Sequence, residues 1–276
     1  MTNIKQKSKR ELLTGLGFYL MILGSLCFLF TVIMGEITRN PNDIYIVKLN
    51  KTSPEAFAED VRDVYGIVIL DVHGHLASSE GKKHMGIIET CLGRFTPEFI
   101  RKLVSVYNES GRRFIIRLED YNNKDDVAGN VRRTDKALTI RLFYNVKAYD
   151  SFGISVDVLA HEIGHAITFL IQDDIGRGTL EAEMRAFNGD FDYVGEQYAE
   201  KWNRSKHSTT FVTAYAMSDY HEDIAEIFGF LIAYPSHIRR TVNNPDNEAL
   251  RDKIKYIGRM TFLYVSIDGV MIFDMV

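Results

Sequence analysis

Apolar positions beyond residue 60 are spaced as in a domain of short strands and longer helices. Apolar runs at residues 65–72 (YGIVILDV), 112–118 (RRFIIRL) and 136–145 (KALTIRLFYN) are typical of buried strands. The polar segment between the last two, residues 119–135, predicts a loop. Residues 260–276 are apolar but interrupted by Asp268, which favours a core segment over a membrane span.

Helical periodicity and end signals predict the helices. Residues 96–111 begin with Thr96 as N-cap and Pro97 in the first turn, and Gly111 ends them. A second helix is expected from about Ile154 to Ile171. Two more are expected, over about 180–202 and from residue 218 or 219 onward. Strands followed mainly by helices indicate an α+β domain.

The N-terminal segment has the character of a membrane anchor. Residues 12–34 contain no charged side chain and would span roughly 35 Å as a helix, enough for a bilayer core. Four basic residues precede this segment, while charges balance in residues 35–50. The positive-inside rule therefore places residues 1–11 in the cytoplasm and the body outside the cell. The alternative is a cleaved signal peptide and a secreted body, but no small-residue cleavage site follows the run.

These boundaries divide the chain into four parts. Residues 1–11 are a cytoplasmic N-terminus, 12–34 the transmembrane anchor in the lipid bilayer, 35–60 a stalk and 61–276 the folded domain. The first 34 residues carry a net charge of +3, which leaves −7 for the rest of a chain with net charge −4. An acidic body argues against nucleic acid as a partner. Cys27 lies in the apolar run and Cys91 in the body, so no disulfide between them is expected.

The segment VLAHEIGHAITF, residues 158–169, contains the sequence pattern H-E-x-x-H. His161 and His165 are four residues apart and share one helix face, so that both rings can bind one metal ion. Glu162 lies about 100° around the helix and can reach a water on that ion as general base. Gly164 leaves room for another segment to approach closely. The pattern also arises by chance, so a metal centre needs further ligands.

A catalytic zinc site takes a third protein ligand and leaves its fourth position to water. Two segments offer carboxylates: TLEAEMRAF with Glu181 and Glu183, and SDYHEDIAEIF with Glu222 and Glu226. Spacing along the chain does not decide between them. Local chemistry favours Glu222 as the ligand, because Glu226, one turn further on, can accept the free ring N–H of a zinc histidine.

The pair of motifs HEIGH and FVTAYAMSDYHEDIAEIF resembles the catalytic domain of anthrax lethal factor and its relatives, which include the bacterial Pro-Pro endopeptidases. The resemblance implies a zincin-type metallopeptidase domain, with a small sheet, the HExxH helix and a helical C-terminal part. In that family a tyrosine lies seven residues before the glutamate ligand, the place of Tyr215 here. Tyr215 is then expected to donate its hydroxyl to the developing oxyanion, although chemistry alone does not exclude Tyr220.

Together with the anchor predicted at residues 12–34, the resemblance implies a membrane-anchored extracellular zinc endopeptidase that binds one Zn²⁺ per chain and hydrolyses a peptide or protein substrate. Zinc would activate a water, and Glu162 would act as its general base. The segment 136–145 is a candidate sheet edge on which an extended peptide could pair. The alternative is a catalytically inactive extracellular binding module that retains the fold. The acidic body favours basic or neutral peptides.

The other histidines are interpreted without a metal. His73, His75 and His84 lie in a polar segment and are expected to be solvated loop residues. His221 adjoins Glu222 and is expected to point away from it.

Overall fold

The computed structural model describes residues 47–120, 127–145, 147–148, 151–152, 154–195 and 209–265. The chain divides into two compact units at Asp43 and Ile44, and every described residue belongs to the second. The expected anchor at 12–34 lies outside the described residues. Within the described residues, no helix combines the length and apolar character needed to cross a membrane.

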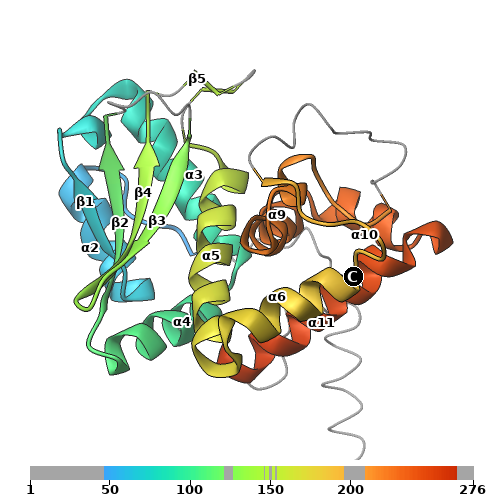
Figure 1. Ribbon diagram of the computed structural model, residues 1–276. Coiled ribbons are helices and arrows are strands. Elements are labelled where there is room, and N and C mark those ends of the chain that lie inside the picture. The colour runs from blue at the N-terminus through green and yellow to red at the C-terminus, as the bar shows by residue number, and fades with distance from the viewer. Residues whose placement is uncertain are drawn as a thin grey trace, which may run out of the picture. The chain divides into compact units, whose positions relative to one another are not determined.

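A four-stranded sheet forms one side of this unit (Figure 1). Its strands in spatial order are β1 (Val68–Asp71), β2 (Arg113–Glu119), β4 (Ala137–Phe143) and β3 (Gly129–Arg133). The first three are parallel, and β3 runs antiparallel to β4. A separate two-stranded ribbon follows, formed by β5 (Lys147–Ala148) and β6 (Ser151–Phe152).

The two faces of the sheet differ, because successive side chains of a strand point to opposite sides. One face is buried in the core and carries Phe114, Ile116 and Leu118 of β2 with Leu138, Ile140 and Leu142 of β4. The opposite face carries partly exposed polar side chains on the same strands, together with Leu70, which is 41% exposed.

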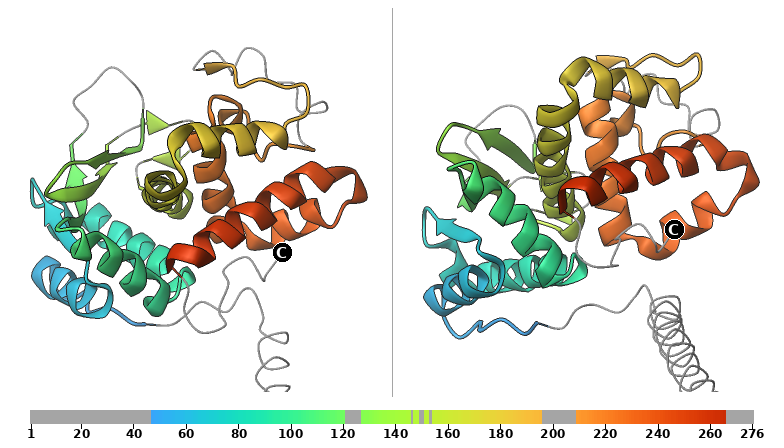
Figure 2. Two further views of the ribbon diagram at one scale, coloured as in Figure 1. Left: turned by 60° about the horizontal axis from the view of Figure 1, so that its bottom comes forward. Right: turned by 90° about the horizontal axis from the view of Figure 1, so that it is seen from below.

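Helices supply most of the remaining structure (Figures 1 and 2). Their bounds are α2 (Pro54–Tyr65), α3 (Ser79–Arg94), α4 (Pro97–Glu109), α5 (Val156–Ile175), α6 (Arg177–Ala186), α9 (Tyr220–Ala233), α10 (Pro235–Val242) and α11 (Glu248–Val265). The helices α2, α4 and α5 contact β1, β2 and the β3–β4 pair respectively. Their apolar faces and the buried face of the sheet form one continuous core.

The helices α5 and α9 lie side by side and hold the centre described below. Gly164 of α5 makes this packing possible: a Cβ there would lie 3.0 Å from the Cα of Ala225 and from the Cβ of Phe228. Any larger residue would force the two helices apart. The close approach expected at Gly164 is therefore present, with α9 as the partner.

The α+β class is confirmed, and three segments differ from the sequence interpretation. Helix α2 begins at Pro54, and its Phe57 is fully buried, so the folded part starts before residue 61. Helix α3 occupies 79–94, where a polar loop was expected. Helix α6 ends at Ala186, well short of residue 202.

The sheet edge was also predicted at the wrong strand. Strand β4 has a hydrogen-bonded neighbour on both sides, so residues 136–145 offer no edge for a peptide. The edge strands of this sheet are β1 and β3, and β3 lies inside the segment 119–135 interpreted as a loop. Its sequence GNVRR has one apolar residue, Val131, because an edge strand needs little burial and shows a weak strand signal.

Candidate metal centre

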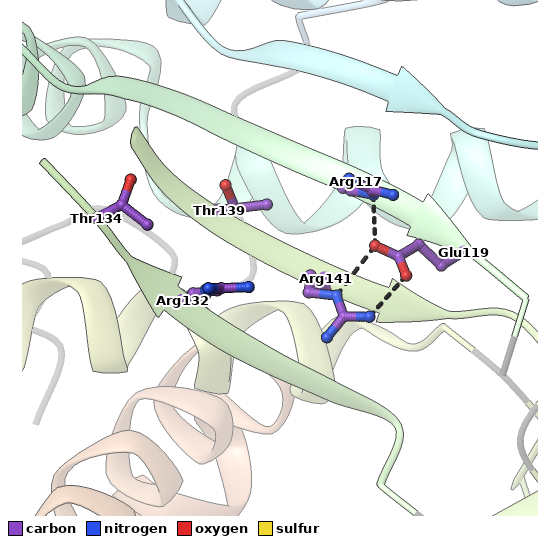
Figure 3. A pocket seen from close by; sticks show the side chains of 6 residues that line it. All are labelled: Arg117, Glu119, Arg132, Thr134, Thr139 and Arg141. Carbon is purple, nitrogen blue, oxygen red and sulfur yellow. Dashed lines mark hydrogen bonds and ion pairs between the residues drawn. The ribbon is translucent and has the colours of Figure 1, made fainter. Parts of the chain in front are cut away.

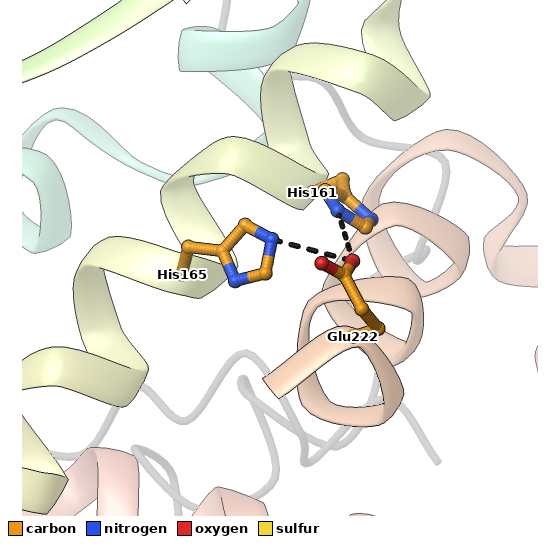
Figure 4. A group of neighbouring side chains, drawn as sticks. All are labelled: His161, His165 and Glu222. Carbon is orange, nitrogen blue, oxygen red and sulfur yellow. Dashed lines mark ion pairs between the residues drawn. The ribbon is translucent and has the colours of Figure 1, made fainter. Parts of the chain in front are cut away.

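Two adjacent turns of α5 place His161 and His165 beside Glu222 of α9 (Figure 4). The Nε2 atoms of His161 and His165 lie 3.1 and 3.4 Å from Oε2 of Glu222. The four-residue spacing puts both rings on the helix face that meets α9. All three side chains are mostly buried, at 12, 14 and 19% exposure.

The start of α9 fixes where Glu222 lies. Asp219 is the N-cap, and its Oδ1 accepts hydrogen bonds from the backbone N–H groups of His221 and Glu222 at 2.7 and 3.1 Å. The free N–H groups of a helix start favour such a carboxylate and any acid in the first turn. Glu222 occupies that first turn, and its side chain points at the histidines.

Glu226, one turn later on α9, bonds the other nitrogen of His161. Its Oε1 lies 2.8 Å from Nδ1 of His161, and the hydroxyl of Thr213 donates to its Oε2 at 2.6 Å. In the neutral ring, an Nδ1–H that donates to Glu226 leaves the lone pair of His161 on Nε2, the atom that faces Glu222. The arrangement that sequence chemistry expected for Glu226 is thus present, with Thr213 as an additional member.

The donor set fits a zinc ion. His161, His165 and Glu222 each offer one ligand atom, and these atoms lie within 4.8 Å of one another. Ligand atoms about 2.0–2.1 Å from a tetrahedral zinc are about 3.3 Å apart, close to the two measured contacts. Oε2 of Glu222 is buried and faces the Nε2 atoms of both histidines. Two imidazoles and one carboxylate are the three ligands of many catalytic zinc sites.

Electrostatics tie these groups together. Burial alone would lower the pKa of His161, but hydrogen bonds with Glu222 and Glu226 outweigh it and raise that pKa. Burial opposes ionisation of Glu222, but hydrogen bonds with His161 and His165 lower the pKa of its carboxyl far below the usual value. The centre therefore holds its charges by mutual attraction, in surroundings where a cation is favoured.

Glu162 is buried beside the ligands, with 4% exposure. Its carboxyl lies against the backbone of β3: a Cβ on Gly129 would be 2.7 Å from Oε1 of Glu162. Its other oxygen, Oε2, has no hydrogen-bond partner. Burial raises the pKa of Glu162, against the attraction of the two histidines. The result is a carboxylate of increased basicity with one oxygen available for a substrate or water.

Tyr215 lies in a short 3-10 turn, Tyr215–Met217, just before α9. Its ring centroid is 5.9 Å from that of His161, and the residue is 36% exposed. Tyr220 is 2% exposed, and burial raises the pKa of its hydroxyl, with smaller effects from Arg177 and Glu181 of α6. Of the two tyrosines, Tyr215 is thus the one beside the histidine ligands.

The other candidate carboxylates are used elsewhere. Glu181 accepts two hydrogen bonds from Arg185, at 2.8 and 3.1 Å, and Glu183 acts electrostatically on Tyr256 of α11. Neither belongs to the group of possible ligands among the described residues. Nε2 of His221 lies 2.8 Å from Gln172, so His221 points away from Glu222 as expected.

The expectation for His75 and His84 is wrong. His84 is 3% exposed in α3, and its Nδ1 lies 2.7 Å from Nε2 of His75. His75 stacks on Tyr144 with ring centroids 3.8 Å apart. The unexpected helix α3 explains the difference, because it carries His84 into the core.

A buried ion pair behind the centre has no signal in the sequence. Nζ of Lys253 in α11 lies 2.7 Å from Oδ2 of Asp223, the residue after Glu222, and both side chains are fully buried. The same Nζ donates to the carbonyl of Thr210 at 2.9 Å, and Tyr193 donates to Asp223 at 2.8 Å. Helix α11 thereby holds both α9 and the segment that leads to Thr213 and Tyr215.

Comparisons with known proteins do not assign this chain to a family. No family model and no curated protein matches it. Among solved structures, it is similar to a crystal structure from Bacteroides caccae described as "a putative zinc-binding metallo-peptidase". The identity is 16% and the TM-score 0.49, over 79% of this chain and 87% of that chain. The function is therefore argued from the side chains of the centre itself.

Proposed function

We propose that the chain is a zinc metalloendopeptidase in which His161, His165 and Glu222 hold one zinc ion. The observation that carries this proposal is the placement of Glu162. A buried carboxylate with one unpartnered oxygen lies next to three donor atoms spaced for a single tetrahedral metal. A site that served structure alone has no need of such a neighbour.

A zinc ion in this place supplies a Lewis acid for the scissile carbonyl and lowers the pKa of a water. Glu162 accepts the proton of the attacking water and delivers it to the leaving amine. Its raised pKa suits both steps. Tyr215, half-exposed beside His161, donates its hydroxyl to the oxyanion. Glu226 and Thr213 keep the His161 ring oriented.

The peptide substrate is proposed to pair with β3. Strand β3 is one of the two edge strands of the four-stranded sheet, and its Gly129 adjoins Glu162. An extended peptide added at this edge therefore passes the general base. Single backbone N-methylation at alternate peptide positions should lower kcat/KM, because it removes ladder hydrogen bonds. Equal cleavage of all methylated peptides would count against pairing.

The cellular location remains a proposal based on residues 12–34. We propose a single-pass anchor with the catalytic domain outside the cell, or a secreted domain if the segment is cleaved. A C-terminal epitope on intact cells should be digested by added protease. Protection of the epitope contradicts the proposed orientation.

The decisive experiment compares the wild-type chain with Glu162→Gln on a diverse peptide library read by mass spectrometry. Both proteins should bind one zinc per chain, and the variant should cleave about 10²- to 10⁴-fold more slowly. Glu183→Gln, the same change outside the centre, should cleave like the wild type. A zinc-bound wild type that cleaves nothing overturns the proposal in favour of an inactive binding module.

A further inference from the structure

The outer face of the sheet carries a group of arginines on the side opposite the core (Figure 3). A cavity of about 360 Å³ on this face is lined by Arg117, Glu119, Arg132, Thr134, Thr139 and Arg141. These six are called the arginine face below. They come from β2, β4, β3 and the turn after β3.

The arginine face places like charges side by side. Arg117 of β2 lies directly opposite Arg141 of β4 in the sheet register. Such a pair is unfavourable unless an anion lies between its members. Glu119 supplies one carboxylate: Arg141 donates to it twice, at 3.0 and 2.7 Å, and Arg117 pairs with it as well. These contacts hold both guanidinium groups in fixed positions.

One carboxylate does not balance three guanidinium groups. Arg132 is exposed and makes no ion pair within the described part of the chain. The hydrogen bonds with Arg141 lower the pKa of Glu119, so this carboxylate is ionised at neutral pH. The lining residues thus retain a net charge of +2, on a body whose overall charge is negative. Guanidinium groups match the geometry of carboxylates and phosphates.

The position of Arg132 relates this charge to the proposed substrate path. Gly129 faces Glu162, and alternation along β3 turns Asn130 and Arg132 to the outer face. Register confirms this, since Arg132 lies opposite Thr139 and Asn130 opposite Arg141. A peptide paired with β3 places alternate side chains next to Arg132, about 10 Å along the strand from Gly129.

We propose that the arginine face is a subsite for an acidic side chain of the substrate, Asp or Glu, about three residues from the scissile bond. Arg132 is the first contact, and Arg141, held by Glu119, is the second. This inference rests on the proposed function and adds a substrate class to it. It also corrects what net charge suggested, because the face that meets the peptide is cationic although the body is acidic.

The test uses the full-length, zinc-loaded chain and one cleaved library peptide, resynthesised with Glu, Ala or Lys at each position near the bond. At a position about three residues from the bond, Glu should exceed Lys in kcat/KM by about tenfold. Arg132→Glu should reverse this order. The control Lys102→Glu makes the same charge reversal at an exposed residue of α4, outside the arginine face. It should keep the wild-type order.

A binding measurement separates this proposal from the catalytic one. Fluorescence anisotropy of the same peptides on Glu162→Gln should show tighter binding of the Glu peptide, and the added Arg132→Glu change should remove that difference. Equal binding of Glu and Lys peptides overturns the subsite even if the wild type cleaves. If the wild type cleaves no peptide while Glu162→Gln still binds the Glu peptide more tightly than the Lys peptide, the peptidase proposal is overturned and the subsite remains. If millimolar inorganic phosphate stabilises the wild type but not Arg132→Glu, and the Glu and Lys peptides bind equally, the arginine face binds a free anion instead.

Discussion

The described part of the chain contains two close pairs of histidines, and their surroundings favour opposite chemistry. His161 and His165 have ring centroids 4.7 Å apart, and His75 and His84 are 4.9 Å apart. The first pair faces the carboxylates of Glu222 and Glu226. In the second pair the two rings bond each other, and the nearby Asp71 accepts backbone N–H groups instead.

The pKa of His161 shifts in the opposite direction to the pKa values of His75 and His84. Carboxylates overcome burial and raise the pKa of His161, whereas burial lowers the pKa of His75 and of His84. The carboxylates around the first pair favour a cation there, whereas burial of the second pair disfavours its protonation. In the described part of this chain, the histidine pair suited to a metal ion is the one that a carboxylate completes.

The largest expected effect follows from removing the carboxylate that completes the first pair. Glu222→Ala should bind no stoichiometric zinc, because two histidines remain where a zinc site needs three protein ligands. Glu183→Ala should retain one zinc per chain, because Glu183 does not belong to the group of possible ligands among the described residues. Zinc content by plasma mass spectrometry after dialysis measures both. Zinc retained without Glu222 and lost without Glu183 would reassign the third ligand.

A smaller effect is expected from the carboxylate behind His161. Glu226→Gln keeps the size of the side chain but weakens the acceptor of the Nδ1 proton. Zinc affinity should fall about 10- to 100-fold, as for other partners of ligand histidines. Competition with a chromophoric chelator measures the change. An unchanged affinity would mean that Glu226 contributes no orientation to the ligand.

The smallest effect concerns the second pair and pH. Because the fold lowers the pKa of His75 and His84 from 6.5, the unfolded state binds more protons below that pH. The free energy of unfolding should therefore decrease as pH falls below about 6.5. In His84→Gln the decrease should be smaller.

Urea unfolding of the metal-free proteins at several pH values measures this dependence. His161 contributes with the opposite sign in both proteins, so its effect cancels in their difference. Equal pH dependence in the two proteins would show that the second pair is not coupled to folding. The zinc content of His84→Gln should equal that of the wild type, since this pair holds no third donor among the described residues.

The sequence predicted the strongly periodic parts of the fold and of the centre. The HEIGH helix and the start of α9 were expected because apolar spacing and capping residues are local signals. Strand β3 and helix α3 were missed, since one lacks apolar alternation and the other begins among polar residues. Sequence chemistry favoured Glu222 over Glu181, but only the packing of α5 on α9 shows which carboxylate faces the histidines.

Other contributors to the centre have no local signal at all. Gly129 accommodates Glu162 from a strand more than thirty residues away. Thr213 supports Glu226, and Lys253 reaches Asp223 from the C-terminal helix. Such contacts depend on tertiary packing. The sequence gives the residue types but does not show which distant residues meet.

The buried pair of Lys253 and Asp223 also constrains how this chain can change over generations. Loss of either partner leaves an isolated charge in the core, typically about 3–5 kcal/mol of destabilisation, out of a total of about 5–15 kcal/mol for a domain. That charge would lie next to the zinc-ligand candidate Glu222. Substitutions at these two positions are therefore expected to occur together. Helix α11 supplies none of the three candidate ligands, yet its lysine is expected to be retained together with the centre that it supports.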